Sequence, residues 1–223
     1  MRSVPPEAGR MQFLPYPLTF MHPTLRMMSS RWVAVENYPR LGVAFVLAYL
    51  FVILAVAVRF LPHPFAFTPV AASLLFFGAR GPRRQMWVPL ALLAASDVIL
   101  TTMVYRFPFT WDHFVTLAWY AGMIWLGTQL RNNAKPVRIL GAALAGSVSF
   151  FLLSNFAVWA VWHDMYPMTF AGLMACYAAG LPFFRRALEG DVIFTSAMFA
   201  IPGLLHAMSG QLHKSSSDHI AAA

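Results

Sequence analysis

The feature of this sequence that most limits its fold is a series of long apolar stretches that carry almost no charge. A helix needs about 20 apolar residues to cross the roughly 30 Å of hydrocarbon in a bilayer. In lipid, only helices and closed barrels satisfy all of their own backbone hydrogen bonds. The stretches that reach or approach this length cover Leu41–Phe60, Gln85–Tyr105, Phe114–Leu130, Ile139–Trp162 and Val192–Met208. The sequence therefore predicts an all-α integral membrane protein, a bundle of about six transmembrane helices.

Composition supports this fold class and excludes several functions. Hydrophobic residues make up 59% of the 223 positions and charged residues 11%, whereas a soluble domain carries about 25% charge. The net charge of +8 comes from short basic clusters between the apolar stretches, which is typical of cytoplasmic loops and requires no nucleic acid. The sequence has no phosphate-binding loop, no His-Glu-x-x-His pair and a single cysteine, Cys176. We therefore expect no enzyme and no bound cofactor.

Two segments allow alternatives. Thr68–Ala79 is short for a full crossing, which suits a short or tilted helix packed inside the bundle. Met168–Phe184 is apolar and uncharged, but Gly172, Gly180 and Pro182 interrupt it. It either crosses as a seventh segment, or it is a re-entrant or interfacial segment that lines a cavity.

Charge and composition also divide the chain. Residues 1–40 are rich in Pro and Met and contain no long apolar stretch, so we expect a disordered or surface-lying tail, or an extension upstream of the true start codon. Residues 41–208 are the expected transmembrane domain, and residues 209–223 are a polar tail. The Lys and Arg residues gather in the N-terminal tail and in alternate loops, which predicts a cytoplasmic N-terminus. The side of the C-terminus depends on whether Met168–Phe184 crosses.

Asp97 is the acid that lies deepest in an apolar stretch. A carboxylate at mid-span costs about 2.5–3.5 kcal/mol on insertion scales, so it should face the bundle interior and find a partner. The candidate partners are Ser96, Thr101, Ser154 and Asn155. Asp97 is therefore either part of a ligand, ion or proton site, or a structural hydrogen-bonding group.

A second set of candidate ligand-binding residues follows the long apolar stretch. Asn155 and Trp159 stand four positions apart and share a helix face. Such a pair can hold a ligand amide and stack on its ring, although hydrogen bonding between helices explains Asn155 equally well. Tyr166, Thr169 and Tyr177 can add further polar groups to a pocket with apolar walls.

Three histidines, His63, His113 and His163, fall on the predicted outer side. Asp112 and Asp164 adjoin the last two of them. Imidazole and carboxylate together suit Zn²⁺, Ni²⁺ or Co²⁺. The histidines come from three different loops, so a metal site requires that these loops converge, and unconnected histidines at a membrane interface are the alternative.

Four motifs carry a resemblance that covers about Leu41–Met208. They are LPHPFAFTPVAASLLFFGARGPRRQMWVPLALLAASDVIL from Leu61, SNFAVW from Ser154, YPMTFAGLMACY from Tyr166 and LPFFRRALEGDVIFT from Leu181. Together they resemble an uncharacterised family of small bacterial multi-pass membrane proteins. That family is distantly similar to the substrate-binding S components of energy-coupling factor (ECF) transporters. These are six-helix proteins that capture vitamins or metal ions at the outer face before an ATPase module drives import.

The resemblance implies a bacterial cytoplasmic (inner) membrane protein that binds a vitamin-like small molecule or a metal ion for transport. It implies a coupling subunit and an ATPase module as partners, besides membrane lipid. We expect an outer pocket with walls from Phe114–Leu130 and Ile139–Trp162, closed by Leu61–Phe67 and Tyr166–Phe184. The alternative is an accessory structural subunit of a larger membrane complex, which contacts other helices instead of a ligand.

Overall fold

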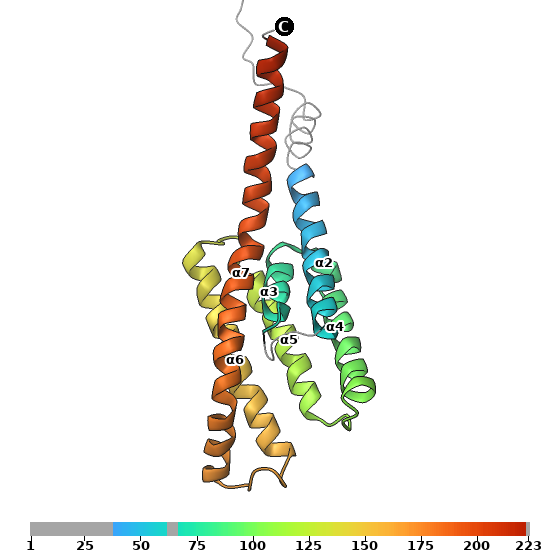
Figure 1. The fold of residues 1–223 in the computed structure, drawn as a ribbon, viewed down its shortest axis with the longest axis vertical. Coiled ribbons are helices and arrows are strands. Elements are labelled where there is room, and N and C mark those ends of the chain that lie inside the picture. The colour runs from blue at the N-terminus through green and yellow to red at the C-terminus, as the bar shows by residue number, and fades with distance from the viewer. Residues whose placement is uncertain (1–37, 62–66, 222–223) are drawn as a thin grey trace, which may run out of the picture. The chain divides into compact units, whose positions relative to one another are not determined.

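The computed structural model describes residues 38–61 and 67–221, and every regular element in that part of the chain is helical. The chain divides into a unit that ends at Arg40 and a second unit, Leu41–Ala223, which holds the helical bundle. The predicted tail of residues 1–40 lies almost entirely outside the described residues. The elements, labelled in Figure 1, are α2 (Tyr38–Phe60), α3 (Val70–Arg80), η1 (Arg83–Gln85), α4 (Trp87–Ile99), η2 (Leu100–Val104), α5 (Asp112–Thr128), α6 (Pro136–Val161) and α7 (Phe170–Ala221).

Four helical stretches are long and apolar enough to cross a membrane. They are Gly42–Phe60, Arg83–Val104, Pro136–Val161 and Phe170–Ser209. Their outward faces are apolar as well, since large side chains such as Val46, Ile53 and Phe170 are exposed. Extended apolar surface of this kind is unfavourable in water and suits lipid. For the described residues, the prediction of an all-helical fold with helices long and apolar enough to cross a membrane is confirmed.

The short helix α3 forms the centre of the bundle. Every residue from Val70 to Ala79 is buried, so the predicted short helix inside the bundle is confirmed. Helices α3 and α5 touch through their backbones at Gly78 and Gly127. A Cβ atom added to Gly78 would lie 2.1 Å from the carbonyl oxygen of Ile124. Small residues allow such close approach between helices.

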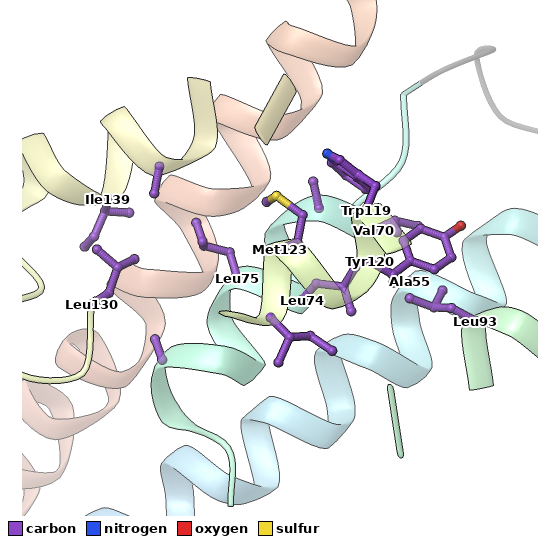
Figure 2. Packing of buried hydrophobic residues seen from close by; sticks show 14 residues of the cluster. Ala55, Val70, Leu74, Leu75, Leu93, Trp119, Tyr120, Met123, Leu130 and Ile139 are labelled. Carbon is purple, nitrogen blue, oxygen red and sulfur yellow. The ribbon is translucent and has the colours of Figure 1, made fainter. Parts of the chain in front are cut away.

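The buried side chains around α3 form a contiguous hydrophobic cluster, drawn in Figure 2. Leu74 of α3 lies near Met123 of α5 in the middle of this cluster. Val70, Trp119 and Tyr120 gather at one end of it. These three residues also line a cavity, so the core and the cavity share a wall.

The C-terminal end of α3 is held by Arg131, which lies in the loop after α5. Its Nε donates a hydrogen bond to the carbonyl oxygen of Gly78 at 2.8 Å, and its Nη2 donates to that of Gly81 at 2.8 Å. The last carbonyls of a helix have no helical partners and carry partial negative charge. Burial and the charge of Arg83 lower the pKa of Arg131, but a guanidinium stays charged at neutral pH. Arg131 therefore caps α3.

Helix α7 differs from what the sequence predicts. Most of Met168–Phe184 is not a segment of its own, and Val192–Met208 is not a separate helix. Both belong to one continuous helix, with Pro182 and Pro202 in its interior. Prolines normally break helices, but in membrane helices the neighbouring helices support the backbone. Helix α6 lies alongside the lower part of α7 (Figure 1).

Candidate binding site

A cavity of about 600 Å³ lies between the ends of several helices. Its wall takes Arg59 from α2, Tyr120 from α5 and Asp191 from α7. The remaining lining residues are Phe60, Leu61, Thr68, Val70, Ala71, Leu100, Val104, Tyr105, Trp119, Phe150 and Ala187. The cavity therefore combines aromatic and aliphatic walls with two ionisable side chains, the combination expected of a small-molecule site.

Arg59 and Asp97 form a buried ion pair at this wall. The guanidinium of Arg59 bonds to Oδ1 of Asp97 and donates to Oγ of Ser96 at 2.7 Å. The hydroxyl of Tyr120 donates to the same Asp97 oxygen at 3.3 Å. Asp97 thus faces the interior and finds a partner, as an acid inside a membrane helix must. Its partners come from two other helices, Arg59 from α2 and Tyr120 from α5.

None of the four candidate partners named from the sequence bonds to the Asp97 side chain in the described residues, and the partners are instead Arg59 and Tyr120 on neighbouring helices. Arg59 stands in the last turn of α2, where a basic residue is usually explained by its reach towards the membrane surface. The structure turns it inward because α2 runs beside α4 at that level (Figure 1). The ion pair provides charge balance inside the bundle.

Asp191 is a second charged residue of the cavity wall that was not predicted as a site residue from the sequence. It lies in α7, is only 7% exposed, and accepts a hydrogen bond from Oγ of Ser147 on α6 at 2.6 Å. One turn further along, the buried hydroxyl of Thr195 has no hydrogen-bond partner among the described residues. The sequence signal for Asp191 is an acid directly before the long apolar stretch Val192–Met208. The predicted segments Met168–Phe184 and Val192–Met208 leave Asp191 in a connection between them.

Helix η2 contributes another side of the cavity. Leu100–Val104 is a π-helical turn, in which the amide of Tyr105 bonds to the carbonyl of Leu100 at 2.8 Å. Such turns insert a residue and often occur at functional sites. The next residue, Arg106, has a positive φ of 56°, which ends the helix. Leu100, Val104 and Tyr105 consequently line the cavity.

None of the predicted substrate-binding residues is among those that line this cavity, and Asp97 adjoins it only through its bonds to Arg59 and Tyr120. Asn155 donates to the carbonyl of Phe151 at 2.8 Å, Trp159 to that of Pro167 at 3.0 Å and Tyr177 to that of Leu152 at 3.0 Å. Thr169 accepts a hydrogen bond from the amide of Gly172 at 3.1 Å in the first turn of α7.

The Tyr177 bond joins α7 to α6 and the Trp159 bond joins α6 to the loop between them. The Asn155 bond stays within α6. Tyr166 belongs to the same loop, where its amide bonds to the carbonyl of Trp162 at 3.2 Å. The expected cover also differs: α7 borders the cavity through Ala187 and Asp191 instead of through Tyr166–Phe184. Of the predicted cover Leu61–Phe67, residues 62–66 lie outside the described residues.

The predicted metal ligands are not brought together in the part of the chain that the structure describes. The ring of His113 lies 3.1 Å from Thr101 and 3.1 Å from the carbonyl of Thr110. The ring of His163 lies 2.9 Å from the carbonyl of Ala160. His63 is outside the described residues, and those residues contain no group of three potential metal ligands.

A second hollow, an apolar groove of about 710 Å³, runs between α5 and α6. Trp111, Phe114 and Trp125 are among its lining residues. The hydroxyl of Ser149 also borders it but accepts a hydrogen bond from Trp119 Nε1 at 3.0 Å. A groove lined almost wholly by carbon offers a ligand little to orient it, so the charged cavity is the stronger candidate site.

Fold and site together define an all-helical protein with helices of membrane-spanning length around a charged, aromatic cavity. More particularly, the chain belongs to a family of unknown function, DUF6580, whose model matches residues 40–212. The expected membership of an uncharacterised family is confirmed. No curated protein and no solved structure matches the chain.

Proposed function

We propose that this protein is a membrane-embedded binding protein that holds a small molecule in the cavity between Arg59 and Asp191, as part of a transport system. The observation that carries the proposal is the cavity itself. Ionisable side chains are costly within a membrane bundle and are kept there for function. Arg59 has a partner that explains its burial, but Asp191 faces a cavity of small-molecule size.

The resemblance to S components of ECF transporters supplies the transport part of the proposal. The transport proposal is supported by the six helices of the described residues, because S components are also six-helix proteins. The short, buried helix α3 is among these six. On this proposal the protein catalyses nothing itself. A coupling subunit and an ATPase module supply the energy, and the protein lies in a bacterial cytoplasmic membrane with its N-terminus in the cytoplasm.

Mass spectrometry of small molecules that co-purify with the protein in mild detergent tests this proposal. The wild-type protein should carry a small molecule. Ala187 lines the cavity, so Ala187→Phe should place a ring in that space and abolish co-purification. Ala179 lies on the same helix and is exposed, so Ala179→Phe is the matched control and should retain the ligand. A wild-type preparation that carries only lipid and detergent, and brings down no ATPase module, contradicts the proposal.

The accessory-subunit alternative has one observation in its favour, the apolar groove between α5 and α6. A helix of another subunit can fill such a groove through van der Waals packing. Gentle extraction followed by native electrophoresis separates the two functions. An accessory subunit should migrate in a complex of fixed composition and carry no small molecule.

A further inference from the structure

The charges that border the cavity do not balance. Arg59 is paired with Asp97, so its positive charge is offset. Asp191 has no ion-pair partner among the described residues. With one basic and two acidic side chains ionised, the cavity and its wall have an excess of one negative charge. A charge in a medium of low dielectric constant interacts strongly with an opposite charge, so this excess favours a cation.

The Asp191 carboxylate is held in place and still has bonding capacity. Ser147 donates to its Oδ2 atom at 2.6 Å, and no described residue donates to its Oδ1 atom. An ionised carboxylate has two oxygens and about four lone-pair sites. Because Asp191 lines the cavity, a ligand can use the remaining sites.

The walls around these charges are rich in aromatic rings. Phe60, Tyr105, Trp119, Tyr120 and Phe150 line the cavity. The ring centroids of Trp119 and Phe150 lie 4.7 Å apart, and those of Trp119 and Tyr120 lie 5.9 Å apart. The faces of such rings attract cations, and groups of aromatic rings bind ammonium ligands in this way.

We infer that the ligand of this cavity is an organic cation, whose ammonium group pairs with Asp191 while its apolar body lies against the aromatic rings. The inference rests on the proposed function and specifies the ligand class. A volume of about 600 Å³ accommodates such a molecule. A bare metal ion needs several donor side chains around it, and the described residues gather no such group.

The test compares molecules that differ mainly in charge. Tyramine, tyrosol and 4-hydroxyphenylacetate share a hydroxyphenyl ring and a short carbon arm but end in a cation, a neutral hydroxyl and an anion. Tetraethylammonium adds a cation without hydrogen-bond donors. Binding of each is measured by isothermal titration calorimetry to the full-length protein in phosphatidylcholine nanodiscs. The cations should bind at least about tenfold more tightly than tyrosol or 4-hydroxyphenylacetate.

Two acids on α7 provide a matched pair of variants. Asp191→Asn should weaken tyramine binding at least about tenfold and remove the preference over tyrosol. Glu189→Gln removes an acid two positions away that is exposed and lies outside the cavity, so affinity should stay within about twofold. Tyr105→Leu changes an exposed cavity residue. It should fold normally and weaken tetraethylammonium binding, which keeps the test valid if Asp191→Asn misfolds.

Two results overturn the inference while the proposed function stands. In one, tyrosol or the anion binds as tightly as the cations. In the other, a correctly folded Asp191→Asn protein keeps the wild-type preference. Absence of binding by every probe also overturns it, and mass spectrometry of co-purified molecules then decides separately whether the protein binds a ligand at all.

Discussion

The pairs Arg59–Asp97 and Arg185–Glu189 join the same kinds of side chain in opposite surroundings. The side chains of the first pair are 18% and 11% exposed, and those of the second are 83% and 53% exposed. Removal of one partner from a buried pair leaves a charge without compensation. An exposed pair loses little, because its long side chains can reach a polar environment.

We therefore predict that Asp97→Asn lowers the free energy of unfolding by about 3–5 kcal/mol. Glu189→Gln should change it by no more than about 0.5 kcal/mol. Thermal unfolding of the purified protein in detergent measures both effects. Each variant removes one acid from an Arg–acid pair, so the comparison isolates burial.

A double variant sharpens this prediction. Arg59→Met combined with Asp97→Leu removes both charges of this pair, and buried pairs replaced by apolar side chains often lose little stability. The double variant should therefore be more stable than either single variant. If its loss equals the sum of the two single losses, the side chains do not interact and the pair has no role in stability.

At the scale of the elements, the contact between α3 and α5 depends on two glycines. A Cβ atom on Gly78 would lie 2.1 Å from the carbonyl oxygen of Ile124, and one on Gly127 would lie 2.3 Å from that of Leu75. These are backbone atoms, which cannot move aside as a flexible side chain can. The two helices must separate to admit a methyl group.

Gly78→Ala and Gly127→Ala should each destabilise the protein by about 1–3 kcal/mol or more. Gly122 lies on α5 with no atom within 4 Å of an added Cβ, so Gly122→Ala is the control. It should be neutral or stabilising, because Ala favours a helix over Gly by about 1 kcal/mol. Thermal unfolding in detergent measures all three variants, and equal effects would falsify the close helix contact.

The cap of α3 gives a second prediction at this scale. Arg131→Gln removes charged hydrogen bonds to the carbonyls of Gly78 and Gly81, so we expect a loss of about 1.5–3 kcal/mol. Arg131→Lys keeps the charge but not the planar guanidinium group, so this variant should be less stable than the wild type but more stable than Arg131→Gln. Hydrogen exchange of the α3 amides should be faster in both. Arg138 is exposed and near the same loop, so Arg138→Gln is the control. If the α3 amides exchange as fast in Arg138→Gln as in Arg131→Gln, Arg131 is not a specific cap.

At the scale of the whole bundle, the continuity of α7 sets the number of crossings. If each of the six helices in the described residues crosses the membrane, the end of α7 lies on the side on which α2 begins, whereas the seven-segment alternative places it on the opposite side. Cys176 is buried at 2% exposure and is the single cysteine. A Cys176→Ser background therefore allows labelling at chosen positions.

In that background we predict that Lys135→Cys and Gln211→Cys react with a membrane-impermeant maleimide from one side. Met165→Cys, in the loop between α6 and α7, should react from the other side. All three native side chains are exposed. Labelling of cells before and after permeabilisation measures the side. Reaction of positions 165 and 211 from the same side is the outcome that contradicts a single crossing by α7.

The sequence by itself determined the class of fold and the presence of an interior acid. Hydropathy is a local property, and a stretch such as Ile139–Trp162 predicts a membrane helix whatever surrounds it. The short helix inside the bundle also followed from length alone. Asp97 stood out because one charge in an apolar stretch must find a partner.

Only the tertiary structure decided which side chains meet. Arg59 and Asp97 are separated by 38 positions, and Ser147 and Asp191 by 44, so no helical periodicity connects them. Helix α7 is also continuous through Pro182 and Pro202, where local propensity predicts breaks. That continuity carries Asp191 to the cavity wall. Contacts between distant helices, which no local pattern encodes, therefore created the candidate site.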